Sequence, residues 1–324
     1  MPNLNVAVIG PPEYAKEIGK KGTSTDITYY NLKKGDLTVT IIEPTRYPDK
    51  LSSLFFAVSQ SLAAVVVIDA ITPEFGECVV MLHCSGINHG FLILRNYITA
   101  EQIAPLIRGT NIEKYRIVPD DPALIRQSLL DLAILLEKER KPLELRVGSV
   151  SIDHFFNVKG IGTVILGGVI DGMIHRHDEV LVYPVKKKAI IRSIQKHDDD
   201  AEDAVMYDRV GLALKGIEAD ELDRGYVLSN GSGLCSSFKI SGELVVIKYW
   251  QTTLKEGMVT YIGHWMQFLP VRIVSVHGDM KSGKLSLSFE SDKKLVYREG
   301  DSAVLHYLEG GKLRIIGTLT LSKF

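Results

Sequence analysis

Hydrophobic and polar positions follow one pattern before residue 142 and a different pattern after it. In the first part, short apolar runs such as Leu4–Ile9 and Ala63–Ile68 alternate with segments in which apolar residues recur at helical spacing. The strongest helical segment starts at Asp121–Pro122 and carries leucines at that spacing as far as Leu136. This alternation predicts an α/β domain with a mostly parallel sheet and helices on both faces.

Local signals mark where two further helices begin. Thr72–Pro73 places a capping residue before a helix-favouring proline, and the helix is expected to run toward Cys84. Thr99 with Gln102 fits a capping box for a short helix that ends near Gly109. The expected strands are Leu4–Ile9, Leu37–Ile42, Ala63–Ile68, Gly90–Leu94 and Tyr115–Val118, and one more helix is expected from Asp49 to Leu62.

After Pro142 the chain turns to short strands and turns, with frequent glycine and no long helical period, which predicts antiparallel β-barrels. Within Val158–Gly172, VKGIGTVILGGVIDG, two strand runs are expected, Thr163–Leu166 and Val169–Ile170, on either side of paired glycines. Glycine permits the sharp bends and close backbone approach that a small closed barrel requires.

The linker Asn230–Ser237, NGSGLCSS, divides this second half in two. We therefore expect an α/β domain over residues 1–142, a first β-barrel over 143–234 and a second β-barrel over 235–324. A barrel of about 90 residues is a plausible size for a compact β domain.

Composition and charge narrow the class of protein further. The chain has 324 residues, of which 45% are hydrophobic and 24% are charged, a composition typical of a soluble protein. Its net charge of −1 does not by itself indicate nucleic-acid binding. Residues 235–324 nevertheless hold 12 Lys and Arg against 8 Asp and Glu, so a phosphate-binding surface is expected there. The sequence has no apolar run long enough to span a membrane, so no membrane partner is expected. Because the N-terminus also lacks the basic flank of a signal peptide, we expect a cytoplasmic location. Cys78, Cys84 and Cys235 are too few and too scattered for a disulfide framework.

Three stretches of the second half resemble the second domain of translational GTPases such as elongation factor Tu and SelB. They are ILGGVIDGMIHRHDEVLVYP, IIRSIQKHDD and DRVGLALKGIEADELDRGYVLSN. ELVVIKYWQTTLKEGM, LPVRIVSV and SLSFESDKKLVYREGD are similar, more loosely, to the third domain. The resemblance covers essentially the whole chain and is strongest to archaeal SelB-like elongation factors. It implies a G-like domain followed by two barrels, and a role in translation.

The family's phosphate-binding loop cannot be placed in this sequence. After the first strand comes GPPEYAKEIGKKGT, in which Gly10 is followed by Pro11 and Pro12, which lack backbone donors for phosphate. Lys20–Asn31 resembles the first switch region of SelB, and Thr25 or Ser24 would take the place of the magnesium-sensing threonine. Without the loop, a hydroxyl-rich turn is the better interpretation.

The other two nucleotide motifs are replaced as well. Glu43–Arg46, EPTR, stands where the family has Asp-x-x-Gly, so Glu43 could substitute for the acid but the glycine is lost. Arg95–Ile98, RNYI, stands where the family reads guanine with Asn-Lys-x-Asp, so Asn96 remains without the acid. Three separate losses predict a degenerate nucleotide site at Gly10, Pro11, Thr25, Glu43 and Asn96. No cofactor is therefore predicted; GTP with Mg²⁺ would bind only if this site works after all.

An aminoacyl pocket is implied by the resemblance to SelB. Asp153 and His154 precede the first barrel strand and Arg209 lies in DRVGLAL, the positions whose family counterparts surround the aminoacyl end. Arg209 offers a fixed fork of donors to an anionic or acceptor-rich group, and His154 can change charge near neutral pH. The alternative is an ordinary ion pair between Asp153 and Arg209 that holds two strands in register.

Other candidates carry weaker signals. Lys293, Lys294 and Arg298 are expected to touch RNA phosphates weakly. Cys78 and Cys84 fall on different faces of one expected helix, so no metal site is predicted, and no set of residues supports a catalytic role. Trp250 and Trp265 are better explained by packing than by base stacking.

These observations favour a non-enzymatic translation-factor relative that binds aminoacyl-tRNA or a related RNA; DNA is not an expected partner, and the sequence leaves a ribosomal partner open. A second hypothesis is a pseudo-GTPase that serves as an interaction module for ribosomal or synthetase partners. A third is a working GTPase with a non-standard phosphate loop.

Overall fold

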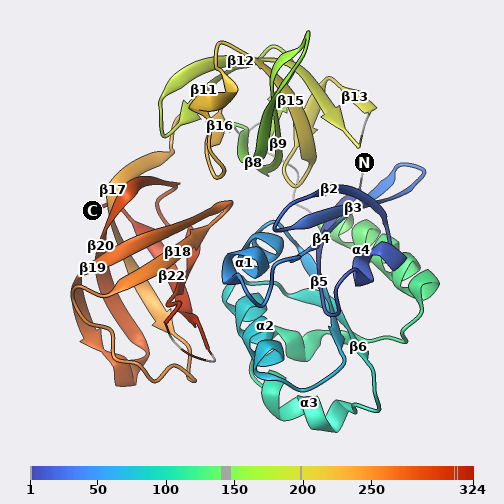
Figure 1. The fold of residues 1–324 in the computed structure, drawn as a ribbon, viewed down its shortest axis with the longest axis vertical. Coiled ribbons are helices and arrows are strands. Elements are labelled where there is room, and N and C mark those ends of the chain that lie inside the picture. The colour runs from blue at the N-terminus through green and yellow to red at the C-terminus, as the bar shows by residue number, and fades with distance from the viewer. Residues whose placement is uncertain (1, 140–146, 198, 310, 312) are drawn as a thin grey trace. The chain divides into compact units, whose positions relative to one another are not determined.

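The computed structural model describes residues 2–139, 147–197, 199–309, 311 and 313–324 (Figure 1). Its residues group into two compact units. The first holds the N-terminal domain together with His306–Thr318, and the second holds most of the two barrels and extends to Phe324. The boundary predicted after residue 142 lies outside the described residues.

The N-terminal domain is built on a seven-stranded sheet in the order β2-β3-β4-β1-β5-β6-β7. Strands β4, β1, β5, β6 and β7 run parallel, as the alternating pattern predicts, whereas β2 and β3 form an antiparallel hairpin on β4. The strands are β1 Asn3–Ile9, β2 Lys20–Ser24, β3 Thr28–Lys34, β4 Leu37–Glu43, β5 Ala63–Ile68, β6 His89–Leu94 and β7 Arg116–Ile117.

Helices cover both faces of this sheet, with α1 and α2 on one side and α4 on the other in Figure 1. Thr72 caps α2 by accepting a hydrogen bond from the Phe75 backbone, and Thr99 with Gln102 forms the predicted capping box of α3. The buried leucines of α4 join inward residues of β1, β4 and β5 in one hydrophobic core. The helices are α1 Leu51–Ser59, α2 Pro73–Cys84, α3 Ala100–Ile107 and α4 Pro122–Glu139.

The middle of the chain forms an antiparallel sheet in the order β11-β16-β8-β9-β15-β12-β13, and pairing of β11 with β12 closes six of these strands into a barrel. Gly162–Asp171 is one continuous strand, β9, so the prediction of two separate strand runs within it is wrong. The strands are β8 Ser149–Val158, β9 Gly162–Asp171, β10 Met173–His175, β11 Glu179–Tyr183, β12 Lys187–Lys196, β13 Asp199–Ala201, β14 Asp203–Val205, β15 Arg209–Lys215 and β16 Val227–Ser229.

The last part of the chain forms a second closed barrel in the order β17-β20-β19-β18-β21-β22. Inward positions such as Ile240, Phe289 and Leu319 are fully buried, and along much of β17 and β20 buried positions alternate with more exposed ones. The α/β domain followed by two barrels confirms the predicted fold class. The strands are β17 Cys235–Val246, β18 Val259–His264, β19 Gln267–Asp279, β20 Lys284–Tyr297, β21 Ser302–His306 and β22 Ile315–Ser322.

The segment His306–Thr318 belongs to the same compact unit as the N-terminal domain. Arg314 donates to both carboxylate oxygens of the buried Glu77 on α2, at 3.0 and 2.6 Å, and to the carbonyl oxygen of Pro48 at 3.1 Å. The ring of His306 packs edge-on against Phe55 of α1. A hydrogen-bonded ion pair and an aromatic contact therefore fasten this segment to α1 and α2.

Candidate functional site

The predicted aminoacyl-pocket residues come together on the first barrel, across strand β9. Asp153 lies at a bulge of β8, because the pairing with β9 shifts between Ile152 and His154. Arg209 is the first residue of β15, which pairs with the opposite edge of β9 from β8, and Arg209 itself pairs with Gly168 of β9. A Cβ at Gly167 would collide with the Ser151 carbonyl oxygen at 2.4 Å. Glycine at this point of β9 therefore lets the backbone of β8 approach closely.

Asp153 is the centre of this cluster. Its side chain has no exposed surface, whereas those of Arg209 and His154 each keep 14%. Arg209 donates to both carboxylate oxygens, one of the two contacts being 3.1 Å long, and His154 Nδ1 lies 2.5 Å from Oδ1. Burial acts to raise the pKa of Asp153, but Arg209 and His154 outweigh it and lower the pKa to about 2. Asp153 is thus a buried, permanent carboxylate that orients one guanidinium and one imidazole.

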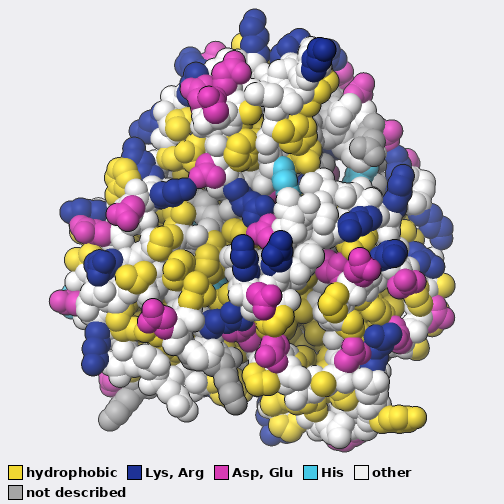
Figure 2. Space-filling model, viewed as in Figure 1, with side chains coloured by type: hydrophobic (Ala, Val, Ile, Leu, Met, Phe, Trp, Pro, Cys, Tyr) yellow, Lys and Arg dark blue, Asp and Glu magenta, His cyan; other side chains and the backbone are white. Residues whose placement is uncertain are grey.

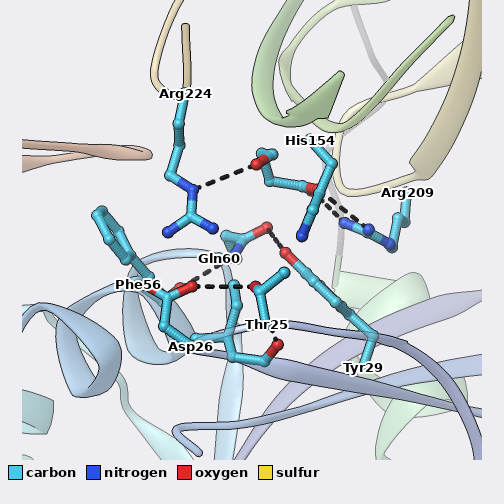
Figure 3. A network of polar contacts seen from close by, with 10 residues as sticks. Thr25, Asp26, Tyr29, Phe56, Gln60, His154, Arg209 and Arg224 are labelled. Carbon is cyan, nitrogen blue, oxygen red and sulfur yellow. Dashed lines mark hydrogen bonds and ion pairs between the residues drawn. The ribbon is translucent and has the colours of Figure 1, made fainter. Parts of the chain in front are cut away.

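A second guanidinium joins the cluster, from a residue that the sequence did not single out. Arg224 Nε donates to the backbone carbonyl of Asp153 at 3.2 Å. Figure 3 shows Arg224 and Arg209 reaching this part of β8 from two different segments of the barrel. No short motif marks Arg224, since its role depends on a contact between residues 71 positions apart. Two arginines and a histidine around one sealed carboxylate favour a ligand that is anionic or rich in hydrogen-bond acceptors.

The three residues predicted to touch RNA phosphates have protein partners. Lys293 Nζ pairs with Asp223 at 2.8 Å, and Lys294 Nζ lies 5.3 Å from the centroid of the Phe238 ring. Arg298 is only partly exposed, pairs with Asp171 at 3.2 Å and donates to Ser149 Oγ at 3.0 Å. Arg298 and Lys293 therefore both pair with residues of the first barrel, and Lys294 lies beside Phe238 on the second barrel.

The segment after β1 does not form a phosphate-binding loop and helix. It makes a single short 3-10 turn, Tyr14–Glu17, and enters the exposed strand β2 at Lys20. A Cβ at Gly10 would lie 2.6 Å from the Cβ of Val67, so the backbone here packs directly on β5. The side chains of Tyr14 and Ile18 are buried in the core. No α-helix within residues 10–24 directs backbone N–H groups toward the end of β1, as phosphate binding would require.

Side chains of the protein itself occupy the carboxyl ends of the parallel strands, where nucleotides bind in open α/β sheets. Tyr14 Oη donates to Asp120 at 2.6 Å, and Arg95 Nε donates to the other oxygen of Asp120 at 2.7 Å. Arg95 also pairs with Asp69 at 3.4 Å. Asn96 follows in a left-handed conformation with φ of 51° and donates to the Asp69 carbonyl at 3.0 Å. The loops after β5, β6 and β7 are thereby tied to one another.

Glu43 and Thr25 lie elsewhere in the same domain. Glu43 ends β4, is 7% exposed and accepts a hydrogen bond from Tyr30 at 2.9 Å through Oε2. Burial raises the pKa of Glu43, against the opposing effect of hydrogen bonds from Tyr30 and from backbone N–H groups. Thr25 sits in the turn between β2 and β3 and donates to Asp26 at 3.0 Å (Figure 3). Tyr29 on β3 donates to Gln60 at 3.0 Å.

Among the described residues, no group of three or more metal-ligating side chains could hold an ion. Over those same residues, no helix is long and apolar enough to cross a membrane. On the face drawn in Figure 2, Lys and Arg side chains are interspersed with Asp and Glu rather than gathered in one basic patch.

Comparison with known proteins agrees with this architecture. Residues 162–229 match the family model for elongation factor Tu domain 2. The chain is 23% identical to elongation factor 1-alpha of Nanoarchaeum equitans over 325 residues, covering 90% of this chain and 74% of the relative. The structure superposes on crystal structures of translation elongation factor SelB from Methanococcus maripaludis, with a TM-score of 0.81 for the apo form and 0.83 for the complex with the GTP analogue GppNHp. The apo form is 22% identical in sequence to this chain and the complex 20% identical. Each match covers 99% of this chain, and it covers 80% of the apo SelB chain and 79% of the SelB chain in the complex.

The chain is thus a relative of the translation elongation factors 1-alpha and SelB and shares the second domain of elongation factor Tu. The chain is 39% identical to "Uncharacterized protein MJ0325" of Methanocaldococcus jannaschii, and the match covers 98% of this chain and 99% of that protein. It is 27% identical to the selenocysteine-specific elongation factor of the same organism over 173 residues, which is 49% of this chain and 37% of that protein. The protein is therefore translation-factor-like in sequence and in fold.

Proposed function

We propose that this protein binds aminoacyl-tRNA or a related RNA through its barrels and does not hydrolyse GTP. The cluster of Asp153, His154 and Arg209 carries the first part of the proposal. Asp153 is sealed from solvent, yet Arg209 and His154 keep exposed surface beside it. That arrangement suits a preorganised pair of donors for an acyl group, with Arg224 held close by.

The geometry of the N-terminal domain supports the second part. GTP with Mg²⁺ needs backbone donors for the phosphates and a carboxylate for the metal. Pro11 and Pro12 lack N–H groups, Gly10 packs on Val67, and Glu43 is buried beneath Tyr30. The residues present do not fit GTP with Mg²⁺, so neither the nucleotide nor the metal ion takes part in the proposed function.

Filter binding with one tRNA in charged and uncharged form tests the RNA proposal. The wild-type protein should hold the charged form at least about tenfold more tightly, a difference of roughly 1.4 kcal/mol. Arg209→Lys should lower affinity for charged tRNA only, because lysine cannot reproduce the planar fork. Lys187→Gln is the matched control, since Lys187 makes an exposed pair with Glu221 on the same barrel. Equal, weak affinity for both forms would exclude acyl recognition.

Isothermal calorimetry with GTP and Mg²⁺ tests the nucleotide proposal. We expect no heat of binding at micromolar concentrations. A micromolar dissociation constant would instead support the hypothesis of a GTPase with a non-standard phosphate loop.

One observation favours the interaction-module hypothesis as a second function. Tyr97 follows Asn96 after β6, has φ of 61° and is fully exposed. A bulky residue in the left-handed region is costly, and an exposed tyrosine on a tethered loop is a typical anchor for a protein partner. Protein partners that survive RNase treatment in a pull-down, and that Tyr97→Ala removes, would support it. Loss of every captured protein after RNase would count against it.

A further inference from the structure

Two aromatic rings stand exposed on the outside of the second barrel. Phe238 near the start of β17 is 48% exposed, and Phe324 after β22 is 66% exposed. Strands β17 and β22 are neighbours in the closed barrel, where a Cβ at Gly242 would lie 2.6 Å from the Thr320 carbonyl oxygen. Phenylalanine side chains that are half exposed or more contribute little to the core, and exposed aromatic rings are available to bind a partner.

An irregularity of the sheet exposes Phe238. Ser237 pairs with Leu295 and Lys239 pairs with Glu290, so one residue of β17 faces four residues of β20. The extra residues 291–294, SDKK, protrude beside Phe238. Ser291 holds the protrusion by donating to the Pro270 carbonyl at 3.0 Å and accepting from the Lys293 backbone at 3.3 Å. These hydrogen bonds hold the backbone of the protrusion beside Phe238.

Each ring is approached by an ammonium group. Lys294 Nζ lies 5.3 Å from the centroid of Phe238, and Lys239 Nζ lies 5.3 Å from the centroid of Phe324. Within the described residues Lys294 has no ion-pair partner, and Lys239 pairs with Glu290 at 3.5 Å between side chains that are more than half exposed. Exposed ion pairs of this kind contribute little, so both lysines are available to another anion. We call these four residues, Phe238, Phe324, Lys239 and Lys294, the aromatic–lysine platform.

Magnitudes favour a nucleobase over the lysine as the partner of each ring. An exposed cation–π contact is worth about two- to fivefold in an equilibrium constant, whereas a base stacked on an aromatic side chain is worth about five- to a hundredfold. An arriving base would displace the ammonium group, which would then lie beside the phosphate of the same nucleotide. Duplex RNA does not fit, because its bases are already stacked on one another.

We propose that the aromatic–lysine platform binds unpaired nucleotides of single-stranded RNA by stacking bases on Phe238 and Phe324 and holding the flanking phosphates with Lys239 and Lys294. This site shares no residue with the Asp153 cluster and reads no aminoacyl group. Its failure and the failure of acyl recognition are therefore distinguishable.

Fluorescence anisotropy with a labelled adenosine RNA dodecamer tests the proposal, since the probe carries no acyl group. The wild-type protein should bind it at least tenfold more tightly than an abasic strand with the same number of phosphates. Phe238→Ala and Phe324→Ala should each weaken binding five- to a hundredfold, whereas Phe238→Trp, which keeps an aromatic ring, should bind as tightly as the wild type. Lys239→Gln with Lys294→Gln should flatten the salt dependence, by about 0.7 in slope for each phosphate that a lysine no longer holds.

Tyr249→Ala is the matched control, because Tyr249 is also exposed on this barrel beneath a lysine, with Lys248 Nζ 4.7 Å from its centroid. It follows the far end of β17, so this variant should bind the dodecamer as the wild type does. The proposal is overturned if the abasic strand binds equally well, or if Tyr249→Ala is as damaging as Phe238→Ala. Equal displacement by polyglutamate of matched charge would assign the surface to an acidic protein instead. Unchanged circular dichroism shows that each variant is folded.

Discussion

Two buried carboxylates, Asp153 on the first barrel and Glu43 in the N-terminal domain, have opposite surroundings. Asp153 on the barrel is fully enclosed and accepts from Arg209 and His154, which lower its pKa to about 2. Glu43 in the N-terminal domain has neutral donors such as Tyr30, and no cation pairs with it among the described residues, so burial raises its pKa. A buried charge is retained at low cost only when a partner compensates it.

The contrast extends to the polar contacts around each site. In the N-terminal domain the loops at the carboxyl ends of the strands bind one another through Arg95, Asp69 and Asp120. On the first barrel, the arginine and the histidine that pair with Asp153 stay partly open to solvent. A fold alone does not define a site, so it is this difference in local contacts that distinguishes the two regions.

The largest expected effect is the loss of Arg209. Arg209→Leu leaves Asp153 buried without its cation, which should destabilise the second compact unit by about 3–5 kcal/mol. Denaturant unfolding followed by tryptophan fluorescence measures this, because both tryptophans, Trp250 and Trp265, lie in that unit.

Lys187→Leu is the control for this measurement, since it removes an exposed partner of Glu221 on the same barrel. It should cost no more than about 1 kcal/mol. Similar losses for Arg209→Leu and Lys187→Leu would mean that the Asp153 pair is no more than a surface ion pair.

The second prediction concerns how the contribution of Asp153 to the free energy of unfolding depends on pH. Its pKa is lowered in the folded protein to about 2, against about 3.9 in an unfolded chain, so its stabilising contribution is complete above about pH 4 and is lost as pH falls toward 2. Asp153→Asn should therefore cost about 2–3 kcal/mol at pH 7 and progressively less below pH 4. Unfolding curves of both proteins across this range measure the difference. A constant difference at all pH values would contradict the assigned shift.

Local signals explain why much of the fold could be predicted from the sequence. The cap at Thr72, the box of Thr99 with Gln102 and the leucine spacing after Asp121 act over a few residues, and each produced the expected helix. The hairpin of β2 and β3 was missed because Lys20–Ser24 is exposed on both faces and shows no alternation of apolar residues.

The candidate site was harder to predict, because its contacts join distant segments. The meeting of Asp153 with Arg209 was proposed from a family resemblance, whereas the part played by Arg224 depends on a backbone contact that no spacing reveals. Nor does sequence alone show that Asp153 gains a cation while Glu43 gains only neutral donors. Burial and partner geometry decide the two pKa shifts, and both arise from tertiary packing.

A smaller effect is expected at Glu43. Because its pKa is raised in the folded state, the folded protein binds the proton more tightly, and the cost of Glu43 grows as pH rises above about 4.3. Glu43→Gln should therefore gain stability relative to the wild type as pH rises, by on the order of 1 kcal/mol, the cost of a buried polar group that is incompletely compensated. Unfolding followed by helical circular dichroism reports on this domain, which contains α1 to α4. A relative gain on acidification would reverse the sign and refute the raised pKa.

The smallest effect is expected at Arg95, whose pairs with Asp69 and Asp120 join side chains that are all about one-third exposed. Arg95→Leu removes both pairs together with the contact of the guanidinium over the Tyr14 ring. Solvent screens such pairs, so the loss of unfolding free energy should stay near or below about 1 kcal/mol and should shrink further in high salt. Arg314→Leu is the contrasting variant in the same compact unit, because it strips the buried Glu77 of its cation and should cost about 3–5 kcal/mol. If Arg95→Leu proved as damaging as Arg314→Leu, the ties between the loops after β5, β6 and β7 would be a main support of the domain, and the contrast between a compensated barrel cluster and a weakly tied N-terminal edge would fail.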